Sequence, residues 1–282
     1  MSLVSTKWLF ENRERVKIID SSWHLPSENR KSEDEYNAEH IDGAIYFDID
    51  ENSDQNSSLP HMLPNKIQWE KIMSKLGISN KDIIVVYDNS DVISSCRLWF
   101  TLQYFGHSKD MIHVLNGGYN KWKKEKLPIT SKKTNVIKAK YIASEKNEMV
   151  KQLKEININI EKKEFKLVDG RSIDRFEGKV EEPRKGLKCG SIKNSLCLPF
   201  KNVINLDKTF KSKKELQYIF TEVIQDINNN NLVFSCGSGI TSCVLALAYS
   251  LINNNYKPTI YDGSWAEYGK IEKRKKLLKS YL

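Results

Sequence analysis

Cys236 has the setting in this chain that best fits covalent chemistry, because it opens a loop, C-G-S-G-I-T, between two apolar stretches. Residues 232–234 before the loop have the composition of a buried strand, and apolar residues recur at helical spacing between 244 and 251. The loop is therefore expected to be a tight turn between a strand and a helix. There, main-chain N–H groups without helical partners and the positive end of the helix dipole stabilise a thiolate. Cys236 is accordingly a candidate nucleophile.

The residues that follow Cys236 in the loop suit an anion; they are Gly237, Ser238, Gly239, Ile240 and Thr241. The two glycines let the main chain curl so that successive N–H groups point to one place. Ser238 adds a hydroxyl, and Thr241 is expected to cap the following helix. The alternative is that Cys236 is a small buried apolar residue at the end of a strand. The glycines favour the reactive thiol.

The elements that must position this loop occur twice along the chain. Four pairs of residues recur at separations between 146 and 149 positions: Asp20 and Asp169, Gly43 and Gly190, Asp88 and Cys236, Gly117 and Gly263. Such a repeat indicates a duplicated unit. Short β-branched runs alternate with helical patterns, such as 67–77 and 213–225, in each copy. The sequence therefore predicts an α/β fold of two tandem domains, each with a mainly parallel sheet flanked by helices.

The domain boundaries follow from composition. We predict a first domain over residues 1–130, a polar, lysine-rich linker over 131–150 and a second domain over 151–282. The stretch 148–156 is a candidate for the first helix of the second domain. The first copy of the cysteine loop begins with Asp88 and contains neither a glycine nor a nucleophile. The second domain is therefore expected to be catalytic and the first to support it.

Composition restricts the partners. The net charge of +9 is spread over lysines that alternate with acids, so a solvated surface is expected and nucleic-acid binding is not. The five cysteines show no repeated C-x-x-C spacing, which indicates neither a disulfide framework nor a zinc site. A reducing compartment, the cytoplasm, is expected, with an organellar form left open. No segment has the apolar length of a membrane span. We expect no metal and no organic cofactor, and a monomer or weak dimer.

Over nearly its whole length the chain resembles the tandem-domain sulfurtransferases of the rhodanese family. Its loop, C-G-S-G-I-T, is similar to the C-G-S-G-V-T usual in the 3-mercaptopyruvate branch, rather than to the C-R-K-G-V-T of the thiosulfate branch. Charged loop residues suit the thiosulfate dianion, whereas Gly237 and Ser238 suit a monoanionic keto acid. The resemblance implies that sulfur passes from 3-mercaptopyruvate to Cys236, which becomes a persulfide. A thiol acceptor, such as thioredoxin or a low-molecular-weight thiol, or cyanide then removes it.

The resemblance also assigns substrate-binding arginines. Arg175 and Arg184, in "SIDRFEGKVEEPRKG", match the two arginines that hold the pyruvyl part of the substrate. A guanidinium group suits a carboxylate and its adjacent carbonyl. Without the resemblance each arginine would be interpreted as a solvated surface residue. Arg171, in "DGRS", also has a family counterpart and is interpreted as a structural brace near the loop.

A proton relay from the first domain is implied in the same way. Asp50, in "FDID", and His61, in "HMLP", resemble the partners that assist proton transfer together with the loop serine, Ser238. Histidine is the side chain best suited to exchange a proton in such a relay, and Asp50 would orient it. The alternative is that Asp50 is a turn residue and His61 a packing residue.

Two other functions remain open at this point. One is the same chemistry on thiosulfate, and the other is a non-catalytic rhodanese-like binding module. A cysteine phosphatase needs an arginine to close its loop, and this chain has Thr241 and Ser242 there. Cys189 and Cys197 are interpreted as local packing residues, and Cys243, two helical turns past Cys236, as packed against the sheet.

Overall fold

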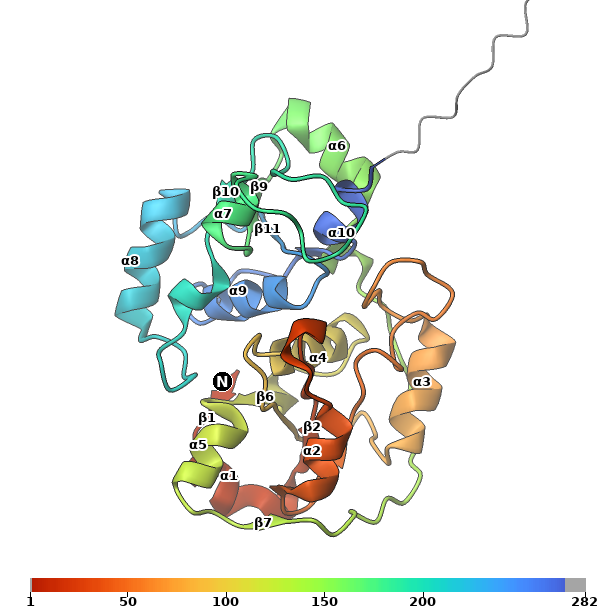
Figure 1. Ribbon diagram of the computed structural model, residues 1–282. Coiled ribbons are helices and arrows are strands. Elements are labelled where there is room, and N and C mark those ends of the chain that lie inside the picture. The colour runs from red at the N-terminus through yellow and green to blue at the C-terminus, as the bar shows by residue number, and fades with distance from the viewer. Residues whose placement is uncertain (1, 272–282) are drawn as a thin grey trace, which may run out of the picture.

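The structure is a computed structural model that describes residues 2–271, and it consists of two α/β domains with the same topology (Figure 1). The first five-stranded sheet has the order β4-β2-β5-β6-β1, and the second has the order β10-β9-β11-β12-β8. All strand pairs in the two sheets are parallel. The predicted fold class is confirmed. Residues 1 and 272–282, at the outer ends of the two predicted domains, lie outside the described residues.

The duplication is visible in the order of elements. The first domain contains β1 (Leu3–Val4), α1 (Thr6–Asn12), β2 (Lys17–Asp20), α2 (Ser32–Ala38), β3 (His40–Ile41), β4 (Ala44–Tyr46), α3 (Lys66–Lys75), β5 (Ile84–Tyr87), α4 (Ser95–Tyr104), β6 (Ile112–Leu115), α5 (Gly118–Lys124) and β7 (Ile129–Thr130). The second contains β8 (Val150–Lys151), α6 (Leu153–Lys162), β9 (Lys166–Asp169), α7 (Ile173–Phe176), β10 (Leu196–Cys197), α8 (Lys213–Ile224), β11 (Leu232–Ser235), α9 (Thr241–Ser250), β12 (Ile260–Tyr261) and α10 (Ser264–Tyr268). Short 3-10 helices lie at Arg13–Arg15, Pro26–Glu28, Lys109–Met111, Asn147–Met149 and Phe200–Val203.

The two helices expected from the clearest amphipathic patterns are α3 and α8. Each begins with a capping box, because the side chain of Asn65 or Ser212 accepts from the main chain of the third helical residue. The side chain of that third residue, Gln68 or Glu215, in turn accepts from the main chain of the cap. Two otherwise unpaired N–H groups are thereby satisfied at each helix start.

Helices α4 and α9 lie between the two sheets and pack against each other (Figure 1). Every residue of α4 is buried, and α9 is buried from Ser242 to Tyr249. One apolar cluster runs through both domains and includes Ile19 and Trp69 of the first and Val168 and Phe234 of the second. Because burying apolar surface stabilises a fold, this shared core makes each domain depend on the other.

The segment that joins the domains is attached to the first domain along its course. Residues 131–146 form no helix or strand. Ala139 N donates to Ser74 O at the end of α3, and Lys146 N donates to Tyr104 O at the end of α4. Tyr141 is buried. The connecting segment is therefore held against the first domain. The exact boundaries of the predicted linker, at 130/131 and 150/151, stay a prediction.

The stretch 148–156 does not form the single helix considered for it. Its first part belongs to a 3-10 turn and to β8, and α6 begins only at Leu153. Val150 pairs with Ile260 at the edge of the second sheet, so sheet pairing overrides the helical pattern there. The carboxylate of Glu155 accepts from Gln152 N and fixes the start of α6.

Each domain sends a loop onto the other at equivalent places. His61, in the loop before α3, contacts Ser238 of the second domain. Lys208, in the loop before α8, contacts Ser90 and Asp91 of the first domain. Ser90 and Ser238 lie 148 positions apart, the separation of Asp88 from Cys236. The interface therefore follows the symmetry of the duplication.

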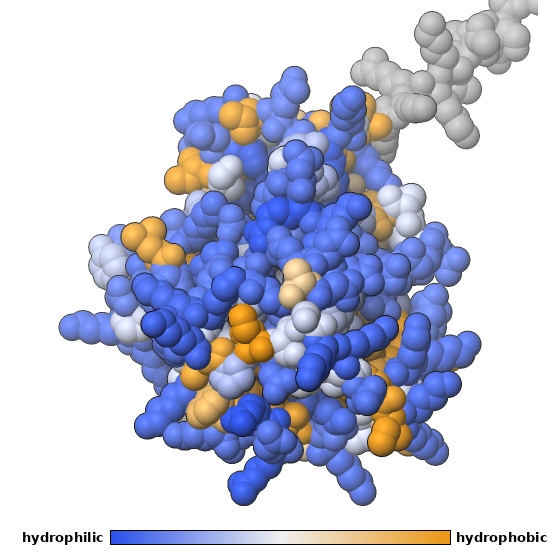
Figure 2. Space-filling view, turned by 60° about the horizontal axis from the view of Figure 1, so that its bottom comes forward, coloured by the Kyte–Doolittle hydropathy of each residue, from blue (hydrophilic) through white to orange (hydrophobic). Residues whose placement is uncertain are grey.

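The surface is mainly hydrophilic on the face shown in Figure 2, where apolar side chains are scattered among charged ones. Most of the large apolar side chains are in the core. Among the described residues, no helix has the length and apolar composition needed to cross a membrane.

Candidate active site

The cysteine loop lies where β11 ends, at the carboxyl edge of the second sheet. Cys236 is 1% exposed, and its sulfur accepts a hydrogen bond from Gly239 N at 3.2 Å. Its own N–H donates to the hydroxyl of Ser264 at 3.1 Å. The carbonyls of Cys236 and Gly237 accept from Trp265 N and Ala266 N at the start of α10. The loop is thus fixed on both sides, with the sulfur on its inner face.

The loop favours the thiolate form of Cys236. Burial opposes that charge, but the polar groups of Thr241, Ser238 and Ser242 around the sulfur outweigh it. The pKa of Cys236 is therefore lowered from its usual value. A thiolate at this position is a nucleophile.

Thr241 has a different role from the expected one. It is the first residue of α9, and the preceding Ile240 occupies the cap position without a side-chain hydrogen bond. The expectation that Thr241 caps the helix is therefore wrong, because Ile240 holds the cap position; the hydroxyl of Thr241 instead helps to lower the pKa of Cys236.

The two loop glycines serve different purposes. Gly239 has φ +83°, in the left-handed region, and a Cβ there would lie 3.0 Å from the carbonyl of Asp262. Gly237 has no such φ, but a Cβ on it would lie 3.1 Å from Arg175 Nη2 and 3.9 Å from Arg184 Nη1. The expectation that both glycines bend the chain is therefore right only for Gly239. Gly237 instead lets two guanidinium groups approach the loop.

The structure brings the three residues of the expected relay together. His61 Nδ1 lies 3.0 Å from Ser238 Oγ, and His61 Nε2 lies 3.1 Å from Asp50 Oδ1. Because Nε2 faces a carboxylate, we assign a proton to it, which leaves Nδ1 to exchange a proton with the hydroxyl. His61 has φ +59°, which is costly for a residue with a side chain. Such strain at a site of chemistry needs support from neighbouring contacts.

Trp23, which the sequence did not single out, supports this relay. Its indole N–H donates to Asp50 Oδ2 at 2.8 Å, and its ring meets that of His61 edge to face at 4.8 Å. Burial opposes the charge on Asp50, but the hydrogen bond and the attraction of His61, with Trp23 and Arg184, hold the pKa of Asp50 below its usual value.

The two arginines expected to bind substrate lie beside the loop. Arg175, in α7, donates to both carboxylate oxygens of Glu182. Arg184 forms no hydrogen bond or ion pair with any residue of the described chain, although the charges of Cys236 and Asp50 act on it. Its pKa is lowered, first by burial, which outweighs the attraction of the Cys236 thiolate. A half-buried guanidinium without a partner is available to an anion.

Arg171 is buried and braces the wall behind these arginines. Its guanidinium binds the Asp169 carboxylate, donates to Gly190 O at 2.8 Å and stacks over Trp265 at 4.2 Å. It also donates to Glu182 Oε1 at 2.7 Å, so Glu182 links the brace to Arg175. The interpretation of Arg171 as structural agrees with this geometry. Glu182 was not recognised from the sequence, although it stands beside Arg184 in "EEPR".

The matching loop of the first domain carries its own anion. Asp88 stands at the position of Cys236, and its carboxylate accepts from Ser90 N at 2.9 Å and from Ser95 N at 3.0 Å. Burial raises the pKa of Asp88 despite these hydrogen bonds. The loop therefore has no nucleophile and no vacant cluster of N–H groups.

The remaining cysteines differ in exposure, and all are free thiols. Cys243 is buried in α9 and donates to Gly239 O at 3.2 Å, as expected for a packed residue. Cys197 is half-buried, and burial raises its pKa to about 11. Cys189 is exposed, so its interpretation as a packing residue is wrong. Within residues 2–271 no cluster of three or more His, Cys, Asp or Glu side chains is arranged to hold a metal.

Two charged residues at the domain interface were also not recognised. Arg97, in α4, contacts Gly239 and His61, and it pairs with Asp262, which follows β12. The available signals were a single charge inside the apolar run "SSCRLWFTL" and an acid at the carboxyl end of a predicted strand. Neither signal identifies the residues that Arg97 and Asp262 contact.

Comparisons with known proteins agree with this geometry. The family model of the rhodanese-like domain matches residues 5–125 and 152–270. The chain is 35% identical to mouse 3-mercaptopyruvate sulfurtransferase over 275 residues, which cover 95% of this chain and 91% of that protein. It is 36% identical to rat thiosulfate sulfurtransferase over 278 residues, with the same coverages. Overall identity therefore does not distinguish the two sulfur donors.

A solved structure gives the same result for the fold. The crystal structure of SseA from Escherichia coli, described as a 3-mercaptopyruvate sulfotransferase, superimposes with a TM-score of 0.81 at 29% identity. The match covers 95% of this chain and 100% of that one. Both domains therefore have a counterpart there.

Proposed function

The chain belongs to the rhodanese family, and from that premise we propose that it is a 3-mercaptopyruvate sulfurtransferase. It takes the sulfur of 3-mercaptopyruvate as a persulfide on Cys236, releases pyruvate and passes the sulfur to a thiol or to cyanide. The observation that carries the proposal is the position of Cys236, whose sulfur accepts a hydrogen bond from its own loop and whose neighbour Gly237 lies against two arginines.

The donor follows from the charges around the loop. Gly237 and Ser238 carry no charge, and a side chain at position 237 would displace the guanidinium of Arg175. The positive charge of the site thus comes from Arg175 and Arg184 rather than from the loop. A guanidinium pair beside the sulfur suits a carboxylate with a neighbouring carbonyl, as in an α-keto acid. Thiosulfate remains the second candidate, because relatives named for it are equally similar.

In the first half-reaction the Cys236 thiolate attacks the thiol sulfur of the donor. A sulfur–sulfur bond forms, the bond between carbon 3 and sulfur breaks, and its electron pair becomes the enolate of pyruvate. Arg175 and Arg184 stabilise the carboxylate and the developing enolate oxygen. His61 in its doubly protonated form passes the proton on Nδ1 through Ser238 to carbon 3, and Asp50 stabilises that charged form. The proton released by the acceptor thiol in the second half-reaction restores it.

In the second half-reaction an acceptor removes the outer sulfur. The thiolate of a low-molecular-weight thiol or of thioredoxin attacks that sulfur, the sulfur–sulfur bond breaks, and Cys236 leaves as a thiolate. The loop N–H groups and hydroxyls that lower the pKa of Cys236 also favour it as a leaving group. Alternation of the two half-reactions gives ping-pong kinetics.

Intact-mass spectrometry after addition of 3-mercaptopyruvate without an acceptor tests the proposal. The wild type is expected to gain one sulfur atom that peptide mapping places on Cys236, with one pyruvate released per chain. Cys236→Ser is expected to gain none, and Cys189→Ser is the matched control because Cys189 is exposed. A sulfur atom retained by Cys236→Ser, or no sulfur uptake by the wild type from any donor, would overturn the proposal, the latter in favour of a binding module.

The compartment and the oligomeric state remain predictions. The cytoplasm and a monomer or weak dimer are the expectations.

A further inference from the structure

We infer that Arg97 is a positioning residue, which holds the histidine of the first domain against the cysteine loop of the second. The inference rests on the proposed function and extends it to a residue that touches neither the reacting sulfur nor the relay side chains. It starts from an unusual placement: a charged side chain that is 3% exposed, within a helix whose other residues are also buried. A charge in such a place needs partners, and its partners belong to the active site.

Each end of the Arg97 guanidinium reaches a different domain. Nη2 donates to the carbonyl of His61, and Nη1 donates to the carbonyl of Gly239 at 3.2 Å. Gly239 is the residue whose N–H group binds the Cys236 sulfur. One planar group therefore fixes the distance between the main chain of His61 and the main chain of the loop.

Asp262 completes the contact from the second domain. Its Oδ1 lies 2.7 Å from Arg97 Nη1, and its Oδ2 accepts from Leu63 N at 3.0 Å. The segment from His61 to Leu63 is therefore held at one end by the arginine and at the other by the carboxylate. We call Arg97 and Asp262, with these contacts, the interdomain clasp.

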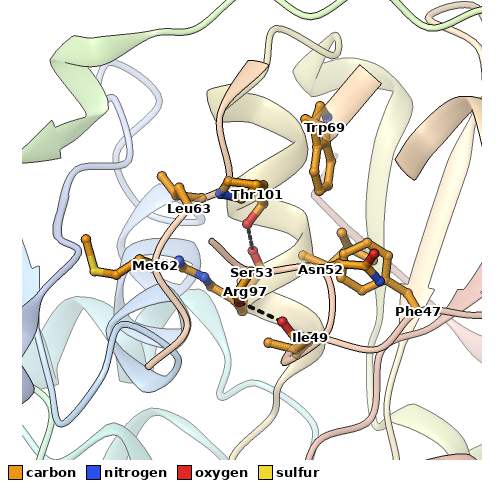
Figure 3. A pocket seen from close by; sticks show the side chains of 11 residues that line it. Phe47, Ile49, Asn52, Ser53, Met62, Leu63, Trp69, Arg97 and Thr101 are labelled. Carbon is orange, nitrogen blue, oxygen red and sulfur yellow. Dashed lines mark hydrogen bonds between the residues drawn. The ribbon is translucent and has the colours of Figure 1, made fainter. Parts of the chain in front are cut away.

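The clasp is buried and closely packed, since Arg97 and Asp262 are each 3% exposed. Figure 3 shows the Arg97 side chain running from α4 toward the segment that carries Met62 and Leu63. The cavity between them measures about 10 Å³, which holds about one water molecule. A Cβ on Gly239 would lie 3.1 Å from Arg97 Nη1, so the loop also packs directly on the clasp.

The clasp explains how the strained histidine keeps its place. His61 has φ +59°, and relaxation of this angle would move the imidazole away from Ser238. A displacement of about 1 Å in a reacting group costs up to about hundredfold in rate. Hydrogen bonds to the carbonyl of His61 and from the N–H of Leu63, both on the C-terminal side of the histidine, oppose that relaxation. Arg97 therefore acts through His61, and a point charge without the fork of donors cannot replace it.

A double-mutant cycle between Arg97 and His61 tests the inference. Arg97→Lys keeps the charge that Asp262 needs but loses the two-pronged contact. His61→Asn removes the relay, and asparagine tolerates the left-handed main chain. We expect Arg97→Lys to lower kcat for pyruvate release by about tenfold or more with KM changed less than about threefold. We expect the double variant to be within about twofold of His61→Asn alone, because both changes disable the same relay.

Several outcomes would overturn the inference. They are full kcat in Arg97→Lys, losses in the two single variants that multiply in the double variant, or an equal loss in Arg30→Lys. Arg30 is the matched control, since it pairs with Glu35 in the first domain. If Arg97→Lys does not fold, Asp262→Asn, of nearly equal volume, enters the same cycle with the same expectation. Sulfur transfer by the wild type is measured first, because its absence would contradict the proposed function. If the wild type is active and kcat is unchanged in Arg97→Lys and in Asp262→Asn, only the role of the clasp is contradicted.

Discussion

Thr241 contributes to the site through its hydroxyl, which supports the thiolate of Cys236. Removal of that hydroxyl in Thr241→Val should raise the pKa of Cys236. The alkylation profile with iodoacetamide should therefore move to higher pH, with a rate about two- to tenfold lower at neutral pH. The measurement uses a Cys189→Ser background, because Cys189 is exposed and would also react. An unchanged profile would mean that the main-chain N–H groups alone stabilise the thiolate.

Asp20, buried at the end of β2, gives a prediction about stability. Burial raises the pKa of Asp20 to about 6, above its value in an unfolded chain. A raised pKa means that folding favours the neutral form, so the contribution of Asp20 to stability is greatest at low pH and is lost as pH rises toward and past about 6. Asp20→Asn should therefore stabilise the protein by about 1–3 kcal/mol at pH 7.5, and by much less near pH 4.

Urea unfolding of the wild type and of Asp20→Asn at both pH values measures this difference. Asparagine keeps an oxygen for the two donors on Ser22, so loss of hydrogen bonds does not confuse the comparison. A variant that is less stable than the wild type at pH 7.5 would contradict the assignment of a buried, costly charge.

At single residues, the sequence predicts chemistry where a side chain type has one main use. It identified Cys236 from its own loop, whereas His61, the relay role of Ser238 and the two arginines were assigned only through the family resemblance. The structure places all of these residues around one loop. It did not predict what Thr241 or Gly237 does, because main-chain dihedral angles and close approaches are not encoded in residue type. Trp23 and Glu182 were missed because their roles consist entirely of contacts with residues that are distant in sequence or on another loop.

The two glycines of the cysteine loop have different roles, so substitution of each is predicted to have a different effect. Gly237→Ala should fold normally, because its φ is ordinary, but its Cβ would press on Arg175. We expect KM for 3-mercaptopyruvate to rise by about tenfold while Cys236 is alkylated at the normal rate. Gly239→Ala should instead lose about 1–2 kcal/mol of stability or more, because its φ is +83°.

Steady-state kinetics and thermal unfolding of the two variants give the comparison. The two glycines are two positions apart in one loop, so each variant is the control for the other. Equal effects of both changes on KM and on stability would contradict the separate roles assigned to them.

Elements with strong local signals were predictable, whereas connections were not. The helices α3 and α8 combine apolar periodicity with capping residues, and both were expected. The stretch 148–156 has a helical pattern too, but a strand pairing to β12 divides it. The two loops that cross between the domains carry no local pattern, so the position of His61 opposite Ser238 was available only from family resemblance.

One large apolar cluster is shared by the two domains, and this predicts cooperative unfolding of the whole molecule. Helices α4 and α9 bury their surfaces against each other, and one apolar cluster includes residues of both sheets. We expect a single calorimetric transition in which the van't Hoff and calorimetric enthalpies agree. Lys208→Ala, which removes the contact of the second domain with Asp91, should lower the midpoint without dividing the transition. Two resolved transitions would contradict the shared core.

The duplication itself was predictable from the sequence, because four pairs of residues recur at nearly constant spacing. The mutual dependence of the domains was not, since it arises from packing between two buried helices that a linear pattern does not relate. The proposed division between a catalytic second domain and a supporting first domain has a physical basis in one substitution at equivalent places. Asp88 fills its loop with its own carboxylate, whereas the sulfur at the equivalent position, on Cys236, is the proposed nucleophile.

The most direct test of the central claim is the ratio of kcat/KM for 3-mercaptopyruvate to that for thiosulfate, with cyanide as the common acceptor, on the wild type and on Cys236→Ser. The account predicts a strong preference of the wild type for 3-mercaptopyruvate and loss of transfer from both donors in the variant. A preference for thiosulfate, or transfer that persists without Cys236, would contradict it.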